Sequence, residues 1–347
     1  MPEQDKPSGK VSSSDVAKLA GVSRSAVSRT FTPGTYVSAD TRAAVIRAAD
    51  LLGYRPNMMA RSLITNRTNI VGIITTHLDN PFYATLLAGL VEALQAKDMA
   101  ALTFIADESS KDEQISRLLS YRVDALVLTN TSLSSKMAMR CAQGATPVIA
   151  INRYIESENI SSVACNNEAA GAQVADLFLE MGRKRIAFMA GETNTSSSRD
   201  RERGFVQRLG ECGGSLFRRV VGNYDHDEGA TAARRMLDQP ERPDAIFCAN
   251  DLMAFSALDV ARDEFGLKVP DELAVVGFDN SDAARWPAYR LTSVDQNIPS
   301  MIQMAVEEIL GALAGTSERG RHLLVEGKLV ERESTGPFRR AIDRAKQ

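Results

Sequence analysis

The sequence predicts a small all-α helix-turn-helix unit followed by a larger α/β core of two doubly wound parallel-sheet subdomains. Two short helical segments joined by a Gly-containing turn lie near the N-terminus, which is the helix-turn-helix pattern. From residue 70 onwards, unbroken apolar runs alternate with helical stretches, as in parallel sheets that are covered on both faces. A segment of roughly 260 residues exceeds the usual size of one such layer, so we expect two subdomains.

Three helices are predicted before residue 54. Ser residues stand where each helix begins and can cap it, namely Ser13 or Ser14, then Ser23, then Ser38. Gly21 and Gly53 supply the turns that follow the first and third helices. The 3.6-residue spacing directs one set of apolar side chains inward: Val16, Leu19, Ala20, Val45, Ile46, Ala49 and Leu52.

Nine apolar runs predict the strands of the core. They are IVGIIT, ALTFIA, ALVLT, PVIAI, SSVAC, RIAFMA, AIFCA, LAVVGF and LTSVD. None of the runs is followed by a glycine-rich phosphate-binding fingerprint. This absence argues against a nucleotide-dependent enzyme.

The formal net charge of −3 conceals an asymmetry. Residues 1–67 carry ten Lys and Arg against five Asp and Glu, whereas the rest of the chain holds 31 basic and 39 acidic side chains. A positive small unit on an acidic body is the usual arrangement of a nucleic-acid reader with an attached control domain.

Cysteine usage and hydropathy indicate a soluble cytoplasmic protein. The four Cys, at positions 141, 165, 212 and 248, are scattered, so we expect small buried residues and neither a disulfide nor a metal site. The N-terminal segment has no apolar core for a secretory signal. No run of about 18 apolar residues predicts a membrane span. No cofactor is expected.

In a helix-turn-helix unit, the second helix enters the major groove and its first residues reach base edges. Here those residues are Arg24, Ser25 and Ala26, with Arg29 one turn further on. An Arg can donate two hydrogen bonds to a guanine edge, worth about 1–3 kcal/mol of discrimination. The alternative is a solvated charged helix. Other polar side chains are expected to position DNA phosphates: Ser23, Thr30, Tyr36, Ser38 and Thr41. Ser28 is a further DNA-binding candidate.

A core of two α/β subdomains predicts a ligand cleft at the carboxyl ends of the strands. Side chains that follow three of the predicted strands are therefore candidates for ligand binding. They are Asn80, Phe82 and Tyr83 after the first strand, Thr129 and Asn130 at the third, and Asn152 and Arg153 after the fourth.

The sequence resembles the lactose-repressor/galactose-repressor (LacI/GalR) family of bacterial transcription regulators. Near the N-terminus the resemblance rests on SDVAKLAGVSRSAVSR, YVSADTRAAVIRAADLLGYRPN and ARSL. In the core it rests on IVGIITTHLDNPFY, RVDALVL, RIAFMAG, RPDAIFCANDLMAFSAL, VPDELAVVGFDN, LTSVDQN and LVERESTG. These motifs keep the family's order from about Val11 to Phe338.

The resemblance implies a periplasmic-binding-protein-like core and a homodimer that reads a pseudo-palindromic operator, with its DNA affinity set by a small-molecule effector. The family's effector positions match Arg201, Tyr224, Asn250 and Asp279. The expected effector is a sugar or sugar derivative; a nucleobase, a nucleoside or a protein co-regulator is the alternative. The protein is expected to be a regulator, most simply a repressor, and not an enzyme. A solute-binding protein is the distant alternative.

The ARSL segment matches a hinge helix that, in the family, orders on operator DNA and inserts Leu side chains into the minor groove. The matching residue is Leu63, with Met59 and Ala60 on the same side. Ile64 stands where some relatives carry Lys, so a basic contact there is absent. The C-terminal RRAIDRAKQ has no Leu heptads, so no tetramer-forming extension is expected.

Together these inferences divide the chain into a disordered tail (1–10), a helix-turn-helix DNA-binding domain (11–56), a hinge helix and linker (57–68) and an effector-binding and dimerisation core (69–340). The N-subdomain of the core is placed at about 69–164 and 295–323, and the C-subdomain at about 165–292 and 325–340.

Structural roles remain as alternatives for several site residues. Asn250 and Asp279 would then cap helices, Arg201 would pair with Asp200 or Glu202, and Phe82 and Tyr224 would be core; Trp286 would rim the cleft or pack in the core or an interface.

Overall fold

The computed structural model describes residues 11–32, 34–56, 67–106, 109–129, 137, 144, 146–193 and 195–336. The chain divides into two compact units, residues 1–68 and residues 69–347. Several predictions fall outside the described residues: the tail at 1–10, Met59, Ala60, Leu63, Ile64, Asn130 and Cys141.

The first unit contains α1 (Ser13–Ala20), α2 (Arg24–Thr30) and α3 (Ala39–Leu52). The predicted caps Ser23 and Ser38 are confirmed, since their hydroxyls accept hydrogen bonds from the backbone N–H groups of Ala26 and Thr41. At α1 the prediction was one or two residues late, because Ser12 is the N-cap and its backbone N–H donates to the Asp15 carboxylate at 2.9 Å. Gly21 and Gly53 end α1 and α3 in the left-handed conformation.

Three valines, Val16, Val27 and Val45, form the buried centre of this unit, one from each helix. Ala49 is buried as predicted. The prediction was wrong for Leu19 and Ile46, whose side chains are 53% and 42% exposed. In each helix the buried stripe is narrow because alanines let the helices approach closely. A residue one step to the side of that stripe therefore reaches solvent.

The second unit contains two six-stranded sheets. The first has the order β11-β5-β4-β3-β1-β2 and consists of β1 (Ile70–Thr75), β2 (Ala100–Ile105), β3 (Ala125–Thr129), β4 (Val148–Ile151), β5 (Ile160–Cys165) and β11 (His322–Val325). The second has the order β12-β10-β9-β8-β6-β7 and consists of β6 (Ile186–Ala190), β7 (Arg218–Val221), β8 (Ala245–Cys248), β9 (Ala274–Asp279), β10 (Thr292–Asp295) and β12 (Lys328–Val330).

All nine predicted strands are present, and their pairing is parallel. Three further strands were not predicted: β7, β11 and β12. They lie at sheet edges and are short, so they lack the unbroken apolar run of a central strand. The β12 strand runs antiparallel to β10, which departs from the predicted all-parallel arrangement.

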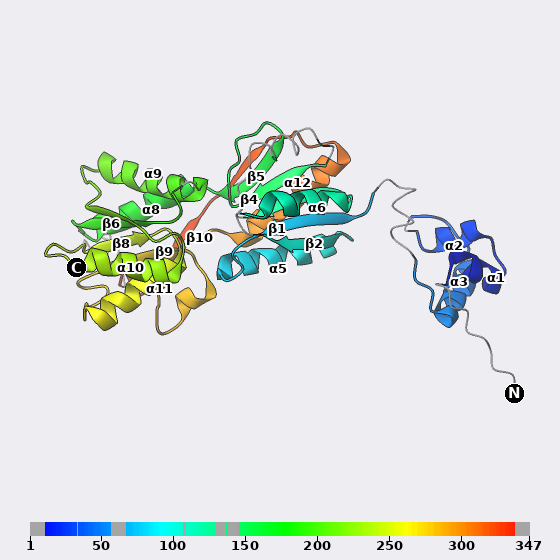
Figure 1. The fold of residues 1–347 in the computed structure, drawn as a ribbon, viewed down its shortest axis with the longest axis horizontal. Helices are drawn as coiled ribbons and strands as arrows, with labels where there is room; N and C mark the ends of the chain where they lie inside the picture. Colours follow the sequence, from blue (N-terminus) through cyan, green and yellow to red (C-terminus); the bar gives the residue numbers. More distant parts are fainter. Residues whose placement is uncertain are drawn as a thin grey trace, which may run out of the picture. The chain divides into compact units, whose positions relative to one another are not determined.

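Helices cover both faces of each sheet (Figure 1). In the first sheet, Ile73 packs against the α5 side and its neighbour Ile74 against the α6 side, as alternation along a strand requires. In the second sheet, α8 and α9 lie on one face and α10 and α11 on the other. The helices are α5 (Pro81–Gln95), α6 (Lys111–Ser120), α8 (Asn167–Glu180), α9 (Ser196–Glu211), α10 (His226–Leu237), α11 (Asp251–Asp259) and α12 (Ile298–Ala314), with short helical turns η1 (Val260–Glu264) and η2 (Asp282–Arg285).

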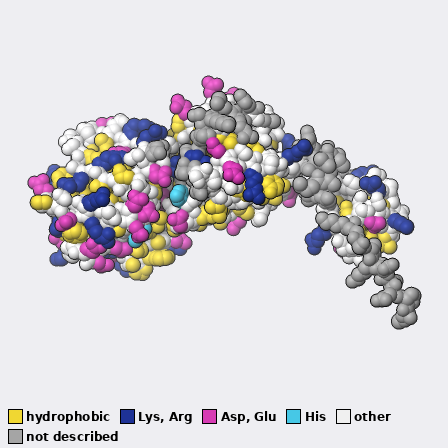
Figure 2. Space-filling model, in the orientation of Figure 1, with side chains coloured by type: hydrophobic (Ala, Val, Ile, Leu, Met, Phe, Trp, Pro, Cys, Tyr) yellow, Lys and Arg dark blue, Asp and Glu magenta, His cyan; other side chains and the backbone are white. Residues whose placement is uncertain are grey.

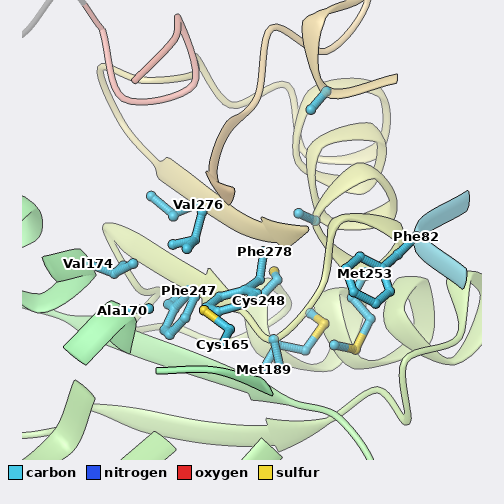
Figure 3. Close-up of a cluster of buried hydrophobic side chains, with 14 of the residues drawn as sticks. Phe82, Cys165, Ala170, Val174, Met189, Phe247, Cys248, Met253, Val276 and Phe278 are labelled. Atoms are coloured by element: carbon cyan, nitrogen blue, oxygen red, sulfur yellow. The ribbon is translucent and has the colours of Figure 1, made fainter. Parts of the chain in front are cut away.

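One hydrophobic cluster joins the two sheets. The chain passes between the sheets after β5, β10 and β11, and the cluster contains residues of both. Figure 3 shows Phe82, at the start of α5, pointing toward Met253 of α11. The two halves of the second unit therefore share a packed core at their junction.

Two of the cysteines are buried as predicted, Cys165 and Cys248, but Cys212 is exposed. It lies at the C-cap of α9, where the chain leaves the helix. In the part of the chain that the structure describes, no helix combines the length and apolar character needed to cross a membrane.

Candidate functional site

The recognition helix α2 presents two arginines to solvent. Arg24 and Arg29 are exposed, as are Ser25 and Ser28, whereas Ala26 is half-buried. The Nε of Arg29 donates to the Ser25 carbonyl at 3.3 Å, which directs the Arg29 stem back toward the start of the helix. Among the described residues, neither Arg24 nor Arg29, the two arginines predicted to contact bases, forms an ion pair.

Around this helix, the polar side chains differ in whether their hydroxyl groups are exposed and able to reach a DNA phosphate. Tyr36 is 87% exposed, and Ser23 and Ser38 are exposed caps whose hydroxyls also contact Ser25 and Thr41 at 2.9 Å. Thr30 is different, since it is 5% exposed and its hydroxyl donates to the Ala26 carbonyl at 2.9 Å. Because its hydroxyl is already bonded within the helix, Thr30 is poorly placed to reach a phosphate.

In the second unit, a cavity of about 480 Å³ lies at the carboxyl ends of strands from both sheets, which is within the usual size range of small-ligand sites. Eight of the eleven residues predicted to bind the ligand line it: Asn80, Phe82, Tyr83, Asn152, Arg201, Tyr224, Asn250 and Asp279. Thr129, Arg153 and Trp286 do not belong to the lining. Thr129 and Arg153 are buried beside it, and Trp286 is 54% exposed.

The first sheet contributes a cap and an aromatic pair to the cavity. Asn80 caps α5, because its Oδ1 accepts from the Phe82 backbone N–H at 2.9 Å. The rings of Phe82 and Tyr83 meet edge to face, with their centroids 5.1 Å apart. The Asn152 side chain donates to the Tyr83 hydroxyl at 3.1 Å. Burial raises the pKa of Tyr83, so its phenol is neutral. Phe82 belongs both to the hydrophobic cluster and to the lining of the cavity.

The second sheet holds Arg201 rigidly in its buried position. Arg201 is 2% exposed; its Nε donates to Asn167 Oδ1 at 2.8 Å and its Nη1 to the Ala249 carbonyl. The guanidinium carbon lies 3.6 Å from the ring centroid of Phe278, a cation–π contact. The alternative of pairing with a neighbouring acid is wrong, because Asp200 and Glu202 bond other arginines, Arg203 and Arg219.

Asn250 and Asp279 have different structural roles. Asn250 does cap a helix, since its Oδ1 accepts from the Met253 N–H at 3.0 Å, and it also donates to the Tyr224 carbonyl at 3.1 Å. Asp279 caps no helix; it accepts one hydrogen bond, from Gln296 Nε2 at 2.6 Å. Asp251, beside it, instead binds the backbone and hydroxyl of Ser281. Asp279 therefore keeps an oxygen for the cavity.

The pKa of Asp279 leads to a pH-dependent prediction. Burial raises this pKa far above 3.8, with Arg201 opposing the shift and Asp251 adding to it. The folded protein then binds the proton more tightly than the unfolded chain. At neutral pH folding must take up a proton that the unfolded chain lacks, which destabilises the fold, and this destabilisation fades as the pH falls toward 4. Asp279→Asn is expected to raise the melting temperature at pH 8. The advantage should shrink with falling pH by up to about 1.4 kcal/mol per unit.

Thermal unfolding of both proteins between pH 5 and pH 9 measures this difference. Asp282→Asn is the matched control, because the Asp282 side chain is 84% exposed and its replacement should leave the profile unchanged. A stability difference for Asp279→Asn that does not vary with pH would contradict the assignment.

Tyr224 lies flat against the backbone of the second sheet. Its hydroxyl is 3.2 Å from the Ser197 hydroxyl, and a Cβ built on Gly191 would lie 2.2 Å from its ring. Only glycine at position 191 leaves room for the ring in this place. Tyr224 is half-buried, so one side of the residue remains available to the cavity.

Backbone strain is concentrated around the cavity. Five lining residues have positive φ: His77 (50°), Asn152 (64°), Asn223 (52°), Tyr224 (63°) and Asp279 (117°). Non-glycine residues in this region are uncommon and cluster at functional sites, where the surrounding structure holds them in place. This backbone strain supports a functional site at the cavity independently of the chemistry of the lining side chains.

Sequence reasoning missed half of the lining: His77, Asp79, Glu192, Ser197, Asn223, Asp225, Glu228 and Leu252. The rule of strand ends would have found Glu192, which follows β6, and Asn223, which follows β7, had β7 been predicted. Many of the missed residues are acidic. Figure 2 shows acidic side chains where the two halves of the core meet. Within the described ranges, no group of three or more His, Cys, Asp or Glu side chains is arranged to hold a metal ion.

An exposed, arginine-bearing recognition helix and a separate ligand cavity between two parallel sheets define a ligand-responsive nucleic-acid-binding protein. Comparison with known proteins agrees with both parts. The profile of "Bacterial regulatory proteins, lacI family" matches residues 14–57, and the "Periplasmic binding protein-like domain" profile matches residues 157–335.

Relatives match over nearly the whole chain. The chain is 31% identical to the HTH-type transcriptional regulator CelR of Thermobifida fusca, covering 92% of this chain and 96% of CelR. It is 30% identical to the HTH-type transcriptional repressor PurR of Erwinia tasmaniensis, covering 94% and 97%. The chain belongs to the LacI family of bacterial regulatory proteins, and it is a DNA-binding transcriptional regulator.

Solved structures share the fold. The lac repressor dimer bound to operator and the anti-inducer ONPF has a TM-score of 0.85 at 25% identity, over 95% of this chain and all of that one. The complex of the regulator CelR with cellobiose has a TM-score of 0.71 at 29% identity, over 93% of this chain and 99% of that one. The core is therefore of the periplasmic-binding-protein type.

Proposed function

We propose that this regulator is a repressor that binds a pseudo-palindromic operator as a homodimer, and that the cavity is its effector site. The observation that carries the proposal is that both sheets line one cavity, Tyr83 and Asn152 from the first and Arg201, Asn250 and Asp279 from the second. A ligand that touches both halves favours one arrangement of them over another. A coupling free energy of about 1–3 kcal/mol changes operator affinity 5- to 150-fold.

The proposed effector is a sugar or sugar derivative. Carboxylate, amide and guanidinium groups bind hydroxyls, and the rings of Phe82 and Tyr224 can cover an apolar sugar face. A relative with this fold binds cellobiose, which makes cellobiose the first compound to test. Nucleosides are the second class, because relatives named PurR are as similar to this chain as CelR is.

The same proposal assigns the remaining parts of the chain. Residues 11–56 bind operator half-sites in the bacterial cytoplasm, and residues 57–68 form the hinge, with Met59, Ala60 and Leu63 in the minor groove. The major-groove surface consists of Ser23, Arg24, Ser25, Ala26, Ser28 and Arg29, flanked by Tyr36 and Ser38. The bound effector is released unchanged, which mass spectrometry of the recovered ligand tests directly.

A thermal-shift screen of the full chain against sugars, polyols, sugar phosphates, nucleobases and nucleosides tests the effector site. A ligand at 100 times its dissociation constant adds about 2.7 kcal/mol to the free energy of unfolding. We expect a stabilising compound that also changes operator affinity in fluorescence anisotropy. A panel without any such compound would overturn the small-molecule proposal and favour a protein co-regulator.

Arg24→Ala should weaken operator binding at one base position. Losing a bidentate contact to guanine costs about 1–3 kcal/mol for operators with that base, and much less for operators changed there. Anisotropy with a set of single-base operator variants measures this difference. Lys18→Ala is the control, since Lys18 is an exposed cation on α1 outside the recognition helix. A uniform loss over all operators would make Arg24 a phosphate contact instead.

A further inference from the structure

We propose that the cavity takes an uncharged ligand that is rich in hydroxyl donors, and that it rejects the anionic counterparts of such a ligand, including sugar phosphates and sugar acids. The inference rests on the proposed effector site and adds the charge and hydrogen-bonding class of its ligand. Three features of the lining carry it: donors that are already bonded, acceptors that are not, and an excess of carboxylates.

The first feature is that three of the lining amides, those of Asn152, Asn223 and Asn250, donate to protein acceptors. Asn152 donates to the Tyr83 hydroxyl at 3.1 Å, Asn250 to the Tyr224 carbonyl at 3.1 Å, and Asn223 to Glu228 at 2.6 Å. Arg201 uses its Nε on Asn167 and its Nη1 on the Ala249 carbonyl. A phosphate or a carboxylate must therefore compete with protein acceptors for these donors.

The second feature is a set of acceptors without partners. Asn152 is 3% exposed, and no described residue donates to its buried Oδ1. A buried acceptor left unbonded destabilises the folded protein, and a ligand hydroxyl at this position would remove that cost. Among the described residues, Asp279 accepts a side-chain hydrogen bond at Oδ1 only, from Gln296, so its second oxygen is also left for the cavity. Asn152 Oδ1 requires a ligand that donates, and the second oxygen of Asp279 requires one when the carboxyl group is ionised.

The third feature is the charge of the lining. Five carboxylates line the cavity, Asp79, Glu192, Asp225, Glu228 and Asp279, against one arginine, Arg201. Arg153 lies behind the lining, with its Nη2 3.6 Å from the Glu192 carboxylate. The balance stays negative with Arg153 included, and it stays negative with Asp279 protonated. An anion entering the cavity would lose hydration and would be repelled by the carboxylates of the lining.

The test compares matched pairs that differ by one anionic group. The probes are glucose with glucose 6-phosphate and glucuronate, cellobiose with cellobiose 6′-phosphate, and adenosine with adenosine 5′-monophosphate. Binding to the full chain is measured by calorimetry and by thermal shift in about 0.15 M salt, so that only charges close to the ligand act. In every pair with measurable binding, the uncharged member should bind at least about 100-fold more tightly.

The possible results separate the two proposals. An anionic member that binds as tightly as its uncharged partner, or more tightly, would overturn this inference and leave the effector site standing. If no member of any pair bound and none altered operator affinity, the small-molecule effector itself would be overturned, and this inference with it.

A pair of variants tests the role of the carboxylates. Glu192→Gln removes one lining charge, so the preference for the uncharged member should fall about tenfold or more. Glu264→Gln is the control, because Glu264 is likewise paired with an arginine, Arg234 at 2.7 Å, but does not line the cavity. An unchanged preference in Glu192→Gln, with both variants folded by their melting temperatures, would overturn the inference.

Discussion

Arg201→Ala is expected to abolish the effector response while leaving operator affinity within about twofold of the wild type in the absence of effector. The side chain lies in the cavity wall, bonded to Asn167 and the Ala249 carbonyl and stacked on Phe278. Its removal deletes a ligand contact and leaves two buried acceptors without donors, each worth about 1–3 kcal/mol. The operator-reading helices belong to the other compact unit, so operator affinity without effector should persist.

Operator anisotropy with and without the stabilising compound from the ligand screen measures this response. Arg203→Ala is the matched control, since Arg203 lies on the same helix but its side chain is 54% exposed and pairs with Asp200 and Glu168. Such surface pairs contribute about 0–1 kcal/mol. Arg201→Lys, which keeps the charge without the planar fork, should restore folding more than it restores the response. A full response in Arg201→Ala would remove Arg201 from the site.

Gly204→Ala is expected to cause a large loss in the free energy of unfolding. A Cβ at this position in α9 would lie 2.0 Å from the backbone oxygen of Glu168 in α8, so the two helices would have to separate. Overpacking costs typically 1–3 kcal/mol and occasionally more, and a clash with backbone belongs at the upper end. We expect a loss of about 3 kcal/mol and a melting temperature lower by roughly 10 °C.

Another glycine of the same helix provides a control variant that should not lose stability. A methyl group added at Gly210 of α9 would meet nothing within 4 Å, so Gly210→Ala should be neutral or stabilising by about 0.5–1 kcal/mol. Chemical denaturation of the two variants compares them. Equal stabilities for Gly204→Ala and Gly210→Ala would show that the close approach of α8 and α9 has no energetic importance.

The close approach of α8 and α9 also affects the site. A Cβ on Gly171 of α8 would lie 2.3 Å from the backbone oxygen of Arg201, so the two glycines set the distance at which Arg201 is presented. Gly204→Ala should therefore weaken effector binding as well as folding.

Much of the architecture followed from local sequence patterns. Central strands such as β3 and β9 are continuous apolar runs that are buried on both faces, and such runs are visible without tertiary information. The caps Ser23 and Ser38 and the turn glycines Gly21 and Gly53 follow from local backbone chemistry. The edge strand β7 and the antiparallel β12 carry no comparable signal, because their pairing depends on neighbours distant in sequence.

The candidate site, too, was predictable in part from local sequence and depends in part on the tertiary structure. Local sequence was enough to place polar and aromatic residues after the strands, at positions such as Asn80 and Asn152, because the end of a strand is a local feature. Which hydrogen-bonding groups remain open depends on the folded chain, since the partners of Arg201 and Asp279 come from Asn167, Ala249 and Gln296. The acidic character of the cavity likewise depends on the fold, because its carboxylates come from segments that are distant in sequence and meet only where the two sheets adjoin.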